Sequence, residues 1–118
     1  MRILYLLTRS DTLSGGAYIH VRDLSEKFIE EGYDVLVGVG GNGPVFEVLE
    51  KRNVPFSRIK YLKNDINPYC DFRATIELIS LIRNYKPNII SAHTTKIGWL
   101  ARIAGKITKK PVIYTPHG

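Results

Sequence analysis

The chain has 118 residues, 44% of them hydrophobic, and a formal net charge of +6. This length suits one domain with its own hydrophobic core. No apolar stretch approaches the roughly 20 residues that span a bilayer, and no small-residue cleavage site follows the apolar run at residues 3–7, so we expect neither a transmembrane helix nor a secretory signal. The lone cysteine, Cys70, excludes an intramolecular disulfide framework and a cysteine-rich zinc site, and favours the cytosol.

The basic net charge favours anionic partners, namely sugar-nucleotide phosphates, acidic lipid headgroups or nucleic acid. The simpler alternative is a basic surface that only keeps the protein soluble. No internal repeat, low-complexity segment or linker interrupts the sequence. We therefore predict one domain over residues 1–118.

The first half of the chain alternates between strand and helix patterns. Residues 3–7 form a continuous apolar run, typical of a strand buried on both faces. A helix follows, whose apolar residues recur at helical spacing: Ala17, Val21, Leu24 and Phe28. Gly32 stands where a glycine commonly follows a helix C-terminus. Residues 34–39 predict a second strand, and Pro44 predicts the start of a short helix.

The middle of the chain is more polar. Residues 56–62 predict a third strand, less hydrophobic and therefore nearer a sheet edge. Residues 64–70, rich in Asn, Asp and Pro, predict a loop. A long helix follows and ends at Pro87. The residues that mark its packed side are Phe72, Ile76, Leu78, Ile79, Ile82 and Arg83.

The last third of the chain predicts two more strands, at residues 89–92 and 112–115, with a helix between them that stops before Pro111. The apolar side of this helix contains Ile97, Leu100, Ile103, Ala104 and Ile107. Five predicted strands alternating with four helices indicate an α/β fold, a doubly wound, Rossmann-like parallel sheet with right-handed crossovers. The expected strand order is 3-2-1-4-5, which places the topological switch between the first and fourth strands.

Three short clusters follow the first, fourth and fifth predicted strands: Gly15-Gly16, His93-Thr94-Thr95 and Pro116-His117-Gly118. In a parallel sheet these clusters share the carboxyl edge, where ligands bind. Glycines allow a backbone to approach a ligand closely, and the N–H groups of a helix start favour an anion. A histidine at a strand end can hydrogen-bond a phosphate or sugar hydroxyl, or transfer a proton. The alternatives are an ordinary glycine loop and histidines that cap their own loops.

Other patterns carry weaker signals. Residues 38–43 match the dinucleotide-binding fingerprint, but Gly38 falls inside the second predicted strand rather than after the first. The three histidines lack the spacing of a zinc motif, and the aspartates show no paired-carboxylate pattern of a glycosidase. Residues 99–110 combine an apolar side with several cations. This helix either rests on an anionic membrane or packs on the sheet with its lysines in solvent.

In order and spacing, the motifs resemble the N-terminal domain of family 4 glycosyltransferases. The resemblance covers the whole chain and rests on Gly15-Gly16 with His20, on residues 91–98 (SAHTTKIG), and on residues 115–118 (TPHG). These are retaining enzymes with two Rossmann-like domains. The resemblance implies a hexosyltransferase-type enzyme that moves a sugar from a nucleotide-sugar donor to a glycan or lipid-linked acceptor, in cell-surface polysaccharide synthesis and without a metal or other cofactor.

The resemblance also implies roles for individual residues. Gly15 and Gly16 would approach the donor diphosphate from across the interdomain cleft. His117 would be catalytic, placed near the transferred sugar to hydrogen-bond a hydroxyl or stabilise developing charge. The residues expected to bind the acceptor or support its site are His20, His93, Thr94, Lys96 and Gly118. Taken alone, His20 is offset from the apolar stripe of its helix, which favours a surface residue without a role.

In that family the C-terminal domain grips the sugar nucleotide, and its glutamate-containing motif is absent from these 118 residues. We therefore expect a folded but inactive fragment that needs its own C-terminal domain, located in the cytoplasm and peripheral on the inner face of the membrane. Two other classes remain open. One is a free-standing nucleotide or dinucleotide-binding module that uses residues 38–43. The other, a nucleic-acid-binding protein, is disfavoured because no base-reading motif or aromatic platform is present.

Overall fold

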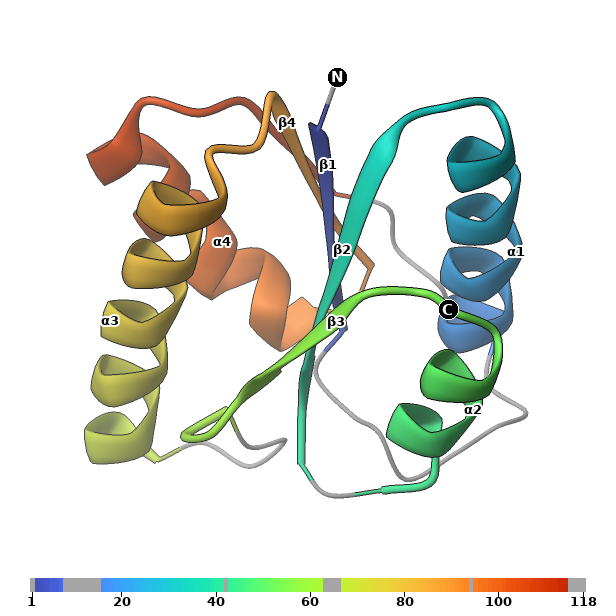
Figure 1. Cartoon of the computed structure of the whole chain (residues 1–118). Coiled ribbons are helices and arrows are strands. Elements are labelled where there is room, and N and C mark those ends of the chain that lie inside the picture. The colour runs from blue at the N-terminus through green and yellow to red at the C-terminus, as the bar shows by residue number, and fades with distance from the viewer. Residues whose placement is uncertain (1, 8–15, 42, 63–66, 94, 115–118) are drawn as a thin grey trace.

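The computed structural model describes residues 2–7, 16–41, 43–62, 67–93 and 95–114. In chain order their elements are β1 (Arg2–Leu7), α1 (Gly16–Glu30), β2 (Asp34–Gly40), α2 (Val45–Lys51), β3 (Phe56–Ile59), α3 (Pro68–Tyr85), β4 (Ile89–Ala92), α4 (Thr95–Thr108) and β5 (Val112–Tyr114). The strands pair in parallel in the order β3-β2-β1-β4-β5. Helices α1 and α2 cover one face of the sheet, and α3 and α4 cover the other (Figure 1). The predicted doubly wound fold and its strand order are confirmed.

The centre of the sheet is β1, which pairs with β2 on one side and β4 on the other. Leu6 of β1 stands opposite both Gly38 and Ala92. Residues 3–7 are buried without exception, as the continuous apolar run predicts for a strand covered on both faces. Because the chain leaves β1 toward β2 but returns beside β1 as β4, the topological switch lies between β1 and β4.

The α1–α2 layer packs one side of the sheet around Val21, Val45 and Leu49, each no more than 1% exposed. Helix α1 ends as predicted at Gly32, whose φ of +93° favours glycine. The N–H of Tyr33 then donates to the carbonyl of Phe28 at 2.9 Å. This bond satisfies a carbonyl of the last turn and turns the chain into β2.

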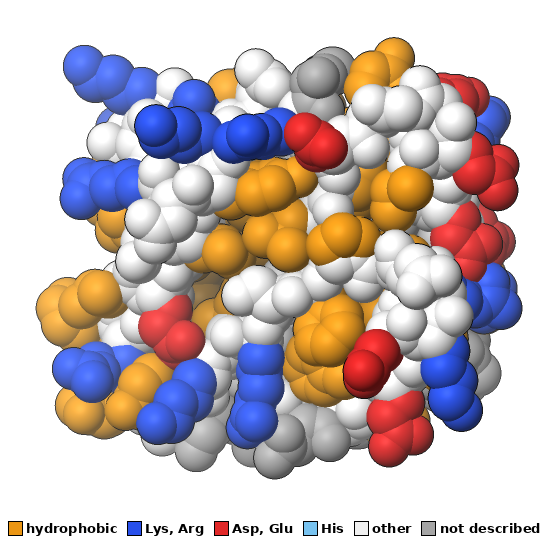
Figure 2. All heavy atoms as spheres, in the orientation of Figure 1, with side chains coloured by type: hydrophobic (Ala, Val, Ile, Leu, Met, Phe, Trp, Pro, Cys, Tyr) orange, Lys and Arg blue, Asp and Glu red, His pale blue; other side chains and the backbone are white. Residues whose placement is uncertain are grey.

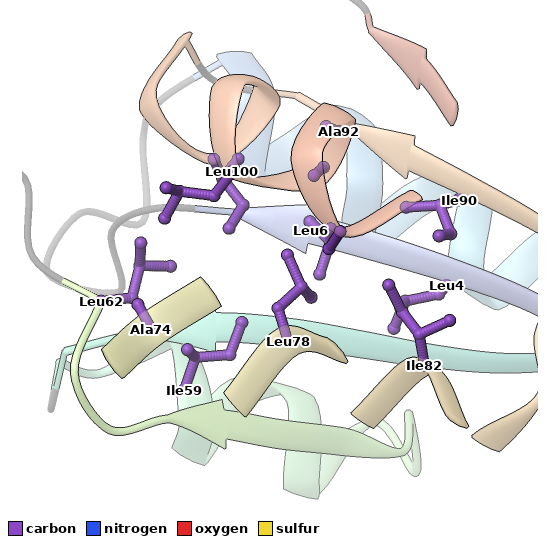
Figure 3. Packing of buried hydrophobic residues seen from close by; sticks show 13 residues of the cluster. Leu4, Leu6, Ile59, Leu62, Ala74, Leu78, Ile82, Ile90, Ala92 and Leu100 are labelled. Atoms are coloured by element: carbon purple, nitrogen blue, oxygen red, sulfur yellow. The ribbon is translucent and has the colours of Figure 1, made fainter. Parts of the chain in front are cut away.

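The α3–α4 layer packs the other side of the sheet (Figure 3). Its buried residues from α3 are Cys70, Ala74, Leu78 and Ile82, and those from α4 are Ile97, Leu100, Ala101 and Ala104. The sequence-based prediction of the packed sides was therefore wrong for five exposed residues: Phe72, Ile76, Arg83, Ile103 and Ile107. Both helices carry apolar side chains on two faces, and the small residues Ala74, Ala101 and Ala104 let the other face approach the sheet and the neighbouring helix closely.

Two element boundaries differ from the prediction by three residues. The third strand ends at Ile59 rather than at residue 62, because the carboxylate of Glu77 accepts hydrogen bonds from the N–H groups of Lys60 and Tyr61 at 2.9 and 2.7 Å. The chain turns there instead of continuing beside β2. Residues 68–70, predicted as the end of a loop, belong to α3, which begins at Pro68.

The start and end of α3 follow ordinary capping chemistry. The side chain of Asn67 accepts a hydrogen bond from the N–H of Cys70 at 3.1 Å, and Pro68 occupies the first turn. At the other end Lys86 adopts a left-handed conformation with φ of 55°, and Pro87 follows it. The predicted end of this helix at Pro87 is confirmed.

Candidate functional site

The carboxyl edge of the sheet collects the ends of the parallel strands and the starts of the helices. In Figure 1 it is the lower edge, where α1 and α3 begin. Strands β1 and β4 are neighbours there, and the N–H of His93 donates to the carbonyl of Leu6 at 3.1 Å. The carboxyl ends of β1 and β4 therefore lie side by side.

His93 is the best-defined candidate residue at this edge. It follows β4 directly and is only 1% exposed. Its Nε2 lies 2.8 Å from Oγ of Ser91, and its ring centroid lies 5.5 Å from that of Tyr5. Burial raises the pKa of the Tyr5 hydroxyl above its ordinary value. The predicted histidine at the end of the fourth strand is confirmed in position, and the imidazole is held inside the sheet edge rather than on its surface.

The other predicted site residues are described only in part. Gly16 is the first residue of α1. His20 lies in α1 and Lys96 in the first turn of α4, although nothing is described of either side chain. The remaining predicted residues, Gly15, Thr94, His117 and Gly118, lie outside the described residues. Their roles, and those of His20 and Lys96, stay predictions.

The glycine run at residues 38–43 has a packing explanation. Gly38 lies inside β2 and is buried. A Cβ atom at Gly38 would lie 2.8 Å from Cδ2 of Leu6 and 3.4 Å from Cδ1 of Ile59. A side chain at this position would require the side chain of Leu6 to shift, so close packing gives a reason for this glycine that needs no dinucleotide. In the part of the chain that the structure describes, no group of three or more His, Cys, Asp or Glu residues could hold a metal ion.

Sequence reasoning missed a cluster of cations and tyrosines at the carboxyl end of β3. The guanidinium of Arg73 lies 5.0 Å from the ring centroid of Tyr61, and Nζ of Lys60 lies 5.7 Å from the same centroid. The ring of Tyr69 meets Tyr61 edge-on with centroids 6.4 Å apart. The interaction with the side chain of Tyr61 raises the pKa of Arg73 above its ordinary value. The spacing of Tyr69 and Arg73 by one helical turn was the available signal.

The chain is similar to known glycosyltransferases in sequence and in fold. A family model described as Glycosyltransferase Family 4 matches residues 14–118. The UDP-Gal:alpha-D-GlcNAc-diphosphoundecaprenol alpha-1,3-galactosyltransferase of Escherichia coli is 28% identical over 107 residues, which cover 90% of this chain and 27% of that protein. The chain thus spans less than a third of the length of this relative.

Solved structures show the same fold. A glycosyltransferase from Rickettsia africae superposes with a TM-score of 0.83 at 19% identity, over 99% of this chain and 30% of that one. HepE from Anabaena, in complex with UDP and glucose, superposes with a TM-score of 0.76 at 23% identity, over 97% of this chain and 29% of that one. Since the family model matches nearly the whole sequence, this chain belongs to glycosyltransferase family 4.

Proposed function

We propose that this chain is the acceptor-side, N-terminal domain of a retaining hexosyltransferase. The enzyme moves a sugar from a nucleotide-sugar donor to a glycan or lipid-linked acceptor in cell-surface polysaccharide synthesis. The observation that carries the proposal is the family match over residues 14–118. The name of the Escherichia coli relative supports both substrate classes, since it specifies a UDP-sugar donor and a diphosphoundecaprenol acceptor. The complex of HepE with UDP and glucose supports the donor class.

The proposal assigns residues 1–118 to one domain and donor binding to a second, C-terminal domain. In support, the chain covers only 27–30% of the length of the Escherichia coli, Rickettsia africae and Anabaena proteins described above. Transfer needs both substrates held in near-attack geometry, which supplies much of the rate enhancement. Half of such a cleft does not hold both substrates, so we expect the 118-residue chain alone to fold without measurable transfer activity.

Within this domain the carboxyl edge is the proposed half-site. Gly15 and Gly16 approach the donor diphosphate, and the position of Gly16 as the first residue of α1 supports this role, because a helix N-terminus favours anions. His117 hydrogen-bonds the transferred sugar or stabilises developing charge. The residues proposed to bind or support the acceptor are His20, His93, Thr94, Lys96 and Gly118. The burial of His93 between Ser91 and Tyr5 favours the supporting role for it.

The proposed location of the enzyme in the cell follows from the class of its acceptor. A lipid-linked acceptor is held by the membrane, so we propose that the enzyme works in the cytoplasm and peripherally on the inner face of that membrane. Transfer is proposed to need no metal ion or other cofactor, and nucleic acid is not a proposed partner.

The deciding experiment starts with the coding sequence beyond Gly118. We expect it to continue into a second α/β domain, and the encoded protein to transfer sugar from a UDP-sugar panel to a polyprenyl diphosphate sugar, also in the presence of EDTA. His117→Ala is expected to lower kcat about 10²–10³-fold, the usual effect of losing a group that stabilises transition-state charge. Ser80→Ala, an exposed change on α3, serves as the matched control. A stop codon directly after Gly118, or full activity of the His117→Ala variant, would overturn the proposal.

A further inference from the structure

A groove lies between the C-terminal ends of α3 and α4. Its volume of about 410 Å³ is in the range of small-ligand sites. Because the two helices run back from the carboxyl edge, their ends lie at the opposite, amino edge of the sheet. In Figure 2, Lys and Arg side chains gather at the upper left, where Figure 1 shows both helix ends. We call this feature the helix-end groove, defined by Ile82, Arg83, Lys86, Ile107, Lys109 and Lys110.

The four cations of the groove, Arg83, Lys86, Lys109 and Lys110, have no counter-charge. No acidic residue lines the groove. None of the four side chains makes an ion pair or a hydrogen bond with any residue that the structure describes. The sequence contains only two acidic residues after position 67, and both lie in the first ten residues of α3, away from its end. The positive charges therefore repel one another without compensation from the protein.

Cations at a helix C-terminus often serve the fold by binding its last carbonyl groups. Other groups fill that role here. Nη1 of Arg2 donates to the carbonyl of Tyr85 at 2.7 Å, and the hydroxyl of Thr108 donates to the carbonyl of Ala104 at 2.7 Å. Each helix end carries about half a negative charge, so two helix ends leave about three of the four positive charges unbalanced.

Two of the four cations occupy a backbone conformation that disfavours lysine. Each helix is followed by a left-handed residue: Gly32 after α1, Asn53 after α2, Lys86 after α3 and Lys109 after α4, with φ of 93°, 58°, 55° and 59°. Glycine and asparagine are the residues that this position favours, because a longer side chain meets the backbone there. Among the described helices, the less favourable residue thus follows only the two that form the groove. A residue kept at a cost to the fold indicates a requirement outside the fold.

We propose that the helix-end groove binds a small soluble ligand with two or more linked phosphate groups. One phosphate group carries about two negative charges at neutral pH and leaves part of the groove's charge unbalanced, whereas two linked groups balance it. The planar guanidinium of Arg83 donates paired hydrogen bonds to phosphate oxygens, and the three lysines add mobile positive charges. Ile107 forms an apolar wall of the groove, beside which water screens these interactions less.

The groove and the proposed half-site lie at opposite edges of the sheet. The ligand of the groove is therefore an addition to the donor and the acceptor rather than one of them, and the inference does not depend on the proposed function. A second copy of the groove is excluded as a partner by the repulsion of like charges. A bilayer of phospholipids complements the groove less well, because each headgroup offers a single phosphate.

The test is isothermal titration of the purified 118-residue chain with sodium pyrophosphate in metal-free buffer. We expect pyrophosphate to bind about tenfold more tightly than orthophosphate, because the second phosphate group adds charge-assisted hydrogen bonds. The affinity should fall as ionic strength rises, since salt screens exposed charges. Equal affinities for pyrophosphate and orthophosphate would overturn the proposal.

The double variant Lys86→Gly/Lys109→Gly removes two cations and relaxes both left-handed positions. It should bind pyrophosphate about tenfold more weakly, and without ligand it should melt about 2–6 °C higher, because glycine adopts this conformation without a steric cost. The opposite signs separate lost ligand contacts from a damaged fold, in which both quantities would fall. Unchanged affinity in this variant would contradict the proposal.

Arg83→Gln removes the guanidinium and leaves the helix ends as they are. We expect it to weaken pyrophosphate binding about tenfold with little change in melting temperature, since Arg83 is exposed. The matched control is Lys27→Ala/Lys51→Ala, which removes two exposed cations from α1 and α2 on the opposite layer. Its affinity for pyrophosphate should stay within about twofold of the parent. An equal loss in the control and in Lys86→Gly/Lys109→Gly would assign the binding to net charge and overturn the proposal.

Amide NMR shifts locate the bound anion. Pyrophosphate should shift the amides of residues 83–86 and 107–110 and leave Gly16, at the start of α1, unchanged. Shifts confined to the surroundings of Gly16 would place the anion at the proposed half-site instead. Sedimentation with phosphatidylglycerol vesicles that depends on Lys86 and Lys109, without pyrophosphate binding, would assign the groove to lipid headgroups. Either result would overturn the proposal.

The same titration is then made with the longer protein that the coding sequence encodes. We expect the same affinity as for the 118-residue chain. A loss of binding there would show that another part of the protein covers the groove, and the proposal would fail. Because the titration requires no catalysis, a failed transfer assay with intact pyrophosphate binding would remove the proposed function and leave this site standing.

Discussion

The α1–α2 layer and the α3–α4 layer cover opposite faces of one sheet, and each buries its inner side almost completely. Their outer sides differ. The α1–α2 layer exposes carboxylates such as Glu47 and Glu50 together with cations such as Lys27 and Lys51. The α3–α4 layer exposes mostly cations, with the large apolar side chains of Phe72 and Trp99. Folding against the same sheet requires the inner sides to be alike and places no such demand on the outer ones. The difference between the outer sides therefore points to a partner rather than to the fold.

The largest loss of stability is expected from changes on the buried inner sides, where the two layers are alike. Leu78→Ala in α3 and Leu49→Ala in α2 each remove a leucine that is at most 1% exposed. Each should lower the free energy of unfolding by about 2–5 kcal/mol, because the lost apolar burial adds to a cavity that the surroundings fill only in part. Urea denaturation measures both losses. If one variant lost less than about 1 kcal/mol, the two layers would not be equivalent supports of the sheet.

Gly105→Ala tests how closely α4 packs on the sheet. A Cβ there would collide with Cγ2 of Val112 and lie 3.1 Å from the carbonyl oxygen of Lys110, which is backbone. Overpacking of this kind costs about 1–3 kcal/mol, more than the gain of up to about 1 kcal/mol from replacing a helical glycine by alanine. We expect a lower melting temperature than that of Ser80→Ala, an exposed change on α3. A more stable Gly105→Ala variant would show that β5 can move away.

Much of the fold was predictable because the strongest local signals agree with the tertiary structure. The continuous apolar run of β1 predicts a central strand. Gly32 and Pro87 predict helix ends through their backbone geometry alone. The side of α3 that packs was not predictable from periodicity. Phe72 and Ile76 are more hydrophobic than Ala74, so the pattern favoured them, while close packing against the sheet favoured the smaller residue.

The candidate site was likewise predictable only in part. The position of His93 after a buried strand follows from the order of elements, and the structure confirms it. Its burial against Tyr5 depends on the pairing of β1 with β4, a contact between segments far apart in the sequence. The cluster of cations and tyrosines around Tyr61 was not predictable from the sequence for the same reason, since Lys60 and Arg73 belong to different parts of the chain.

Glu77→Ala tests the tie between α3 and the end of β3. The variant leaves the N–H groups of Lys60 and Tyr61 without their carboxylate acceptor. Both groups lie near solvent, which replaces the bonds in part, so the expected loss is about 1–2 kcal/mol. Glu77→Gln, which keeps a carbonyl acceptor of the same length, should recover part of that loss in the same urea experiment. Equal stability of the two variants and the parent would show that this turn needs no side-chain acceptor.

The ion pair between α1 and α2 should contribute less. Nη1 of Arg52 lies 2.6 Å from Oε1 of Glu26, and both side chains are partly exposed. Exposed pairs contribute about 0.2–1 kcal/mol and are screened by salt. Arg52→Ala should therefore cost a few tenths of a kcal/mol at low ionic strength and almost nothing in 1 M salt. A loss that does not change with salt would assign the effect to packing of the arginine stem instead.

The smallest effect is expected where the two layers differ most. Phe72 is 66% exposed, and serine is close to phenylalanine in helix propensity, so Phe72→Ser should change the free energy of unfolding by less than about 0.5 kcal/mol. An aromatic side chain on this outer side that adds nothing to stability is then explained by binding. If Phe72→Ser instead destabilised the chain as strongly as Leu78→Ala, the aromatic residue would be part of the fold, and the contrast between the outer sides would lose its functional meaning.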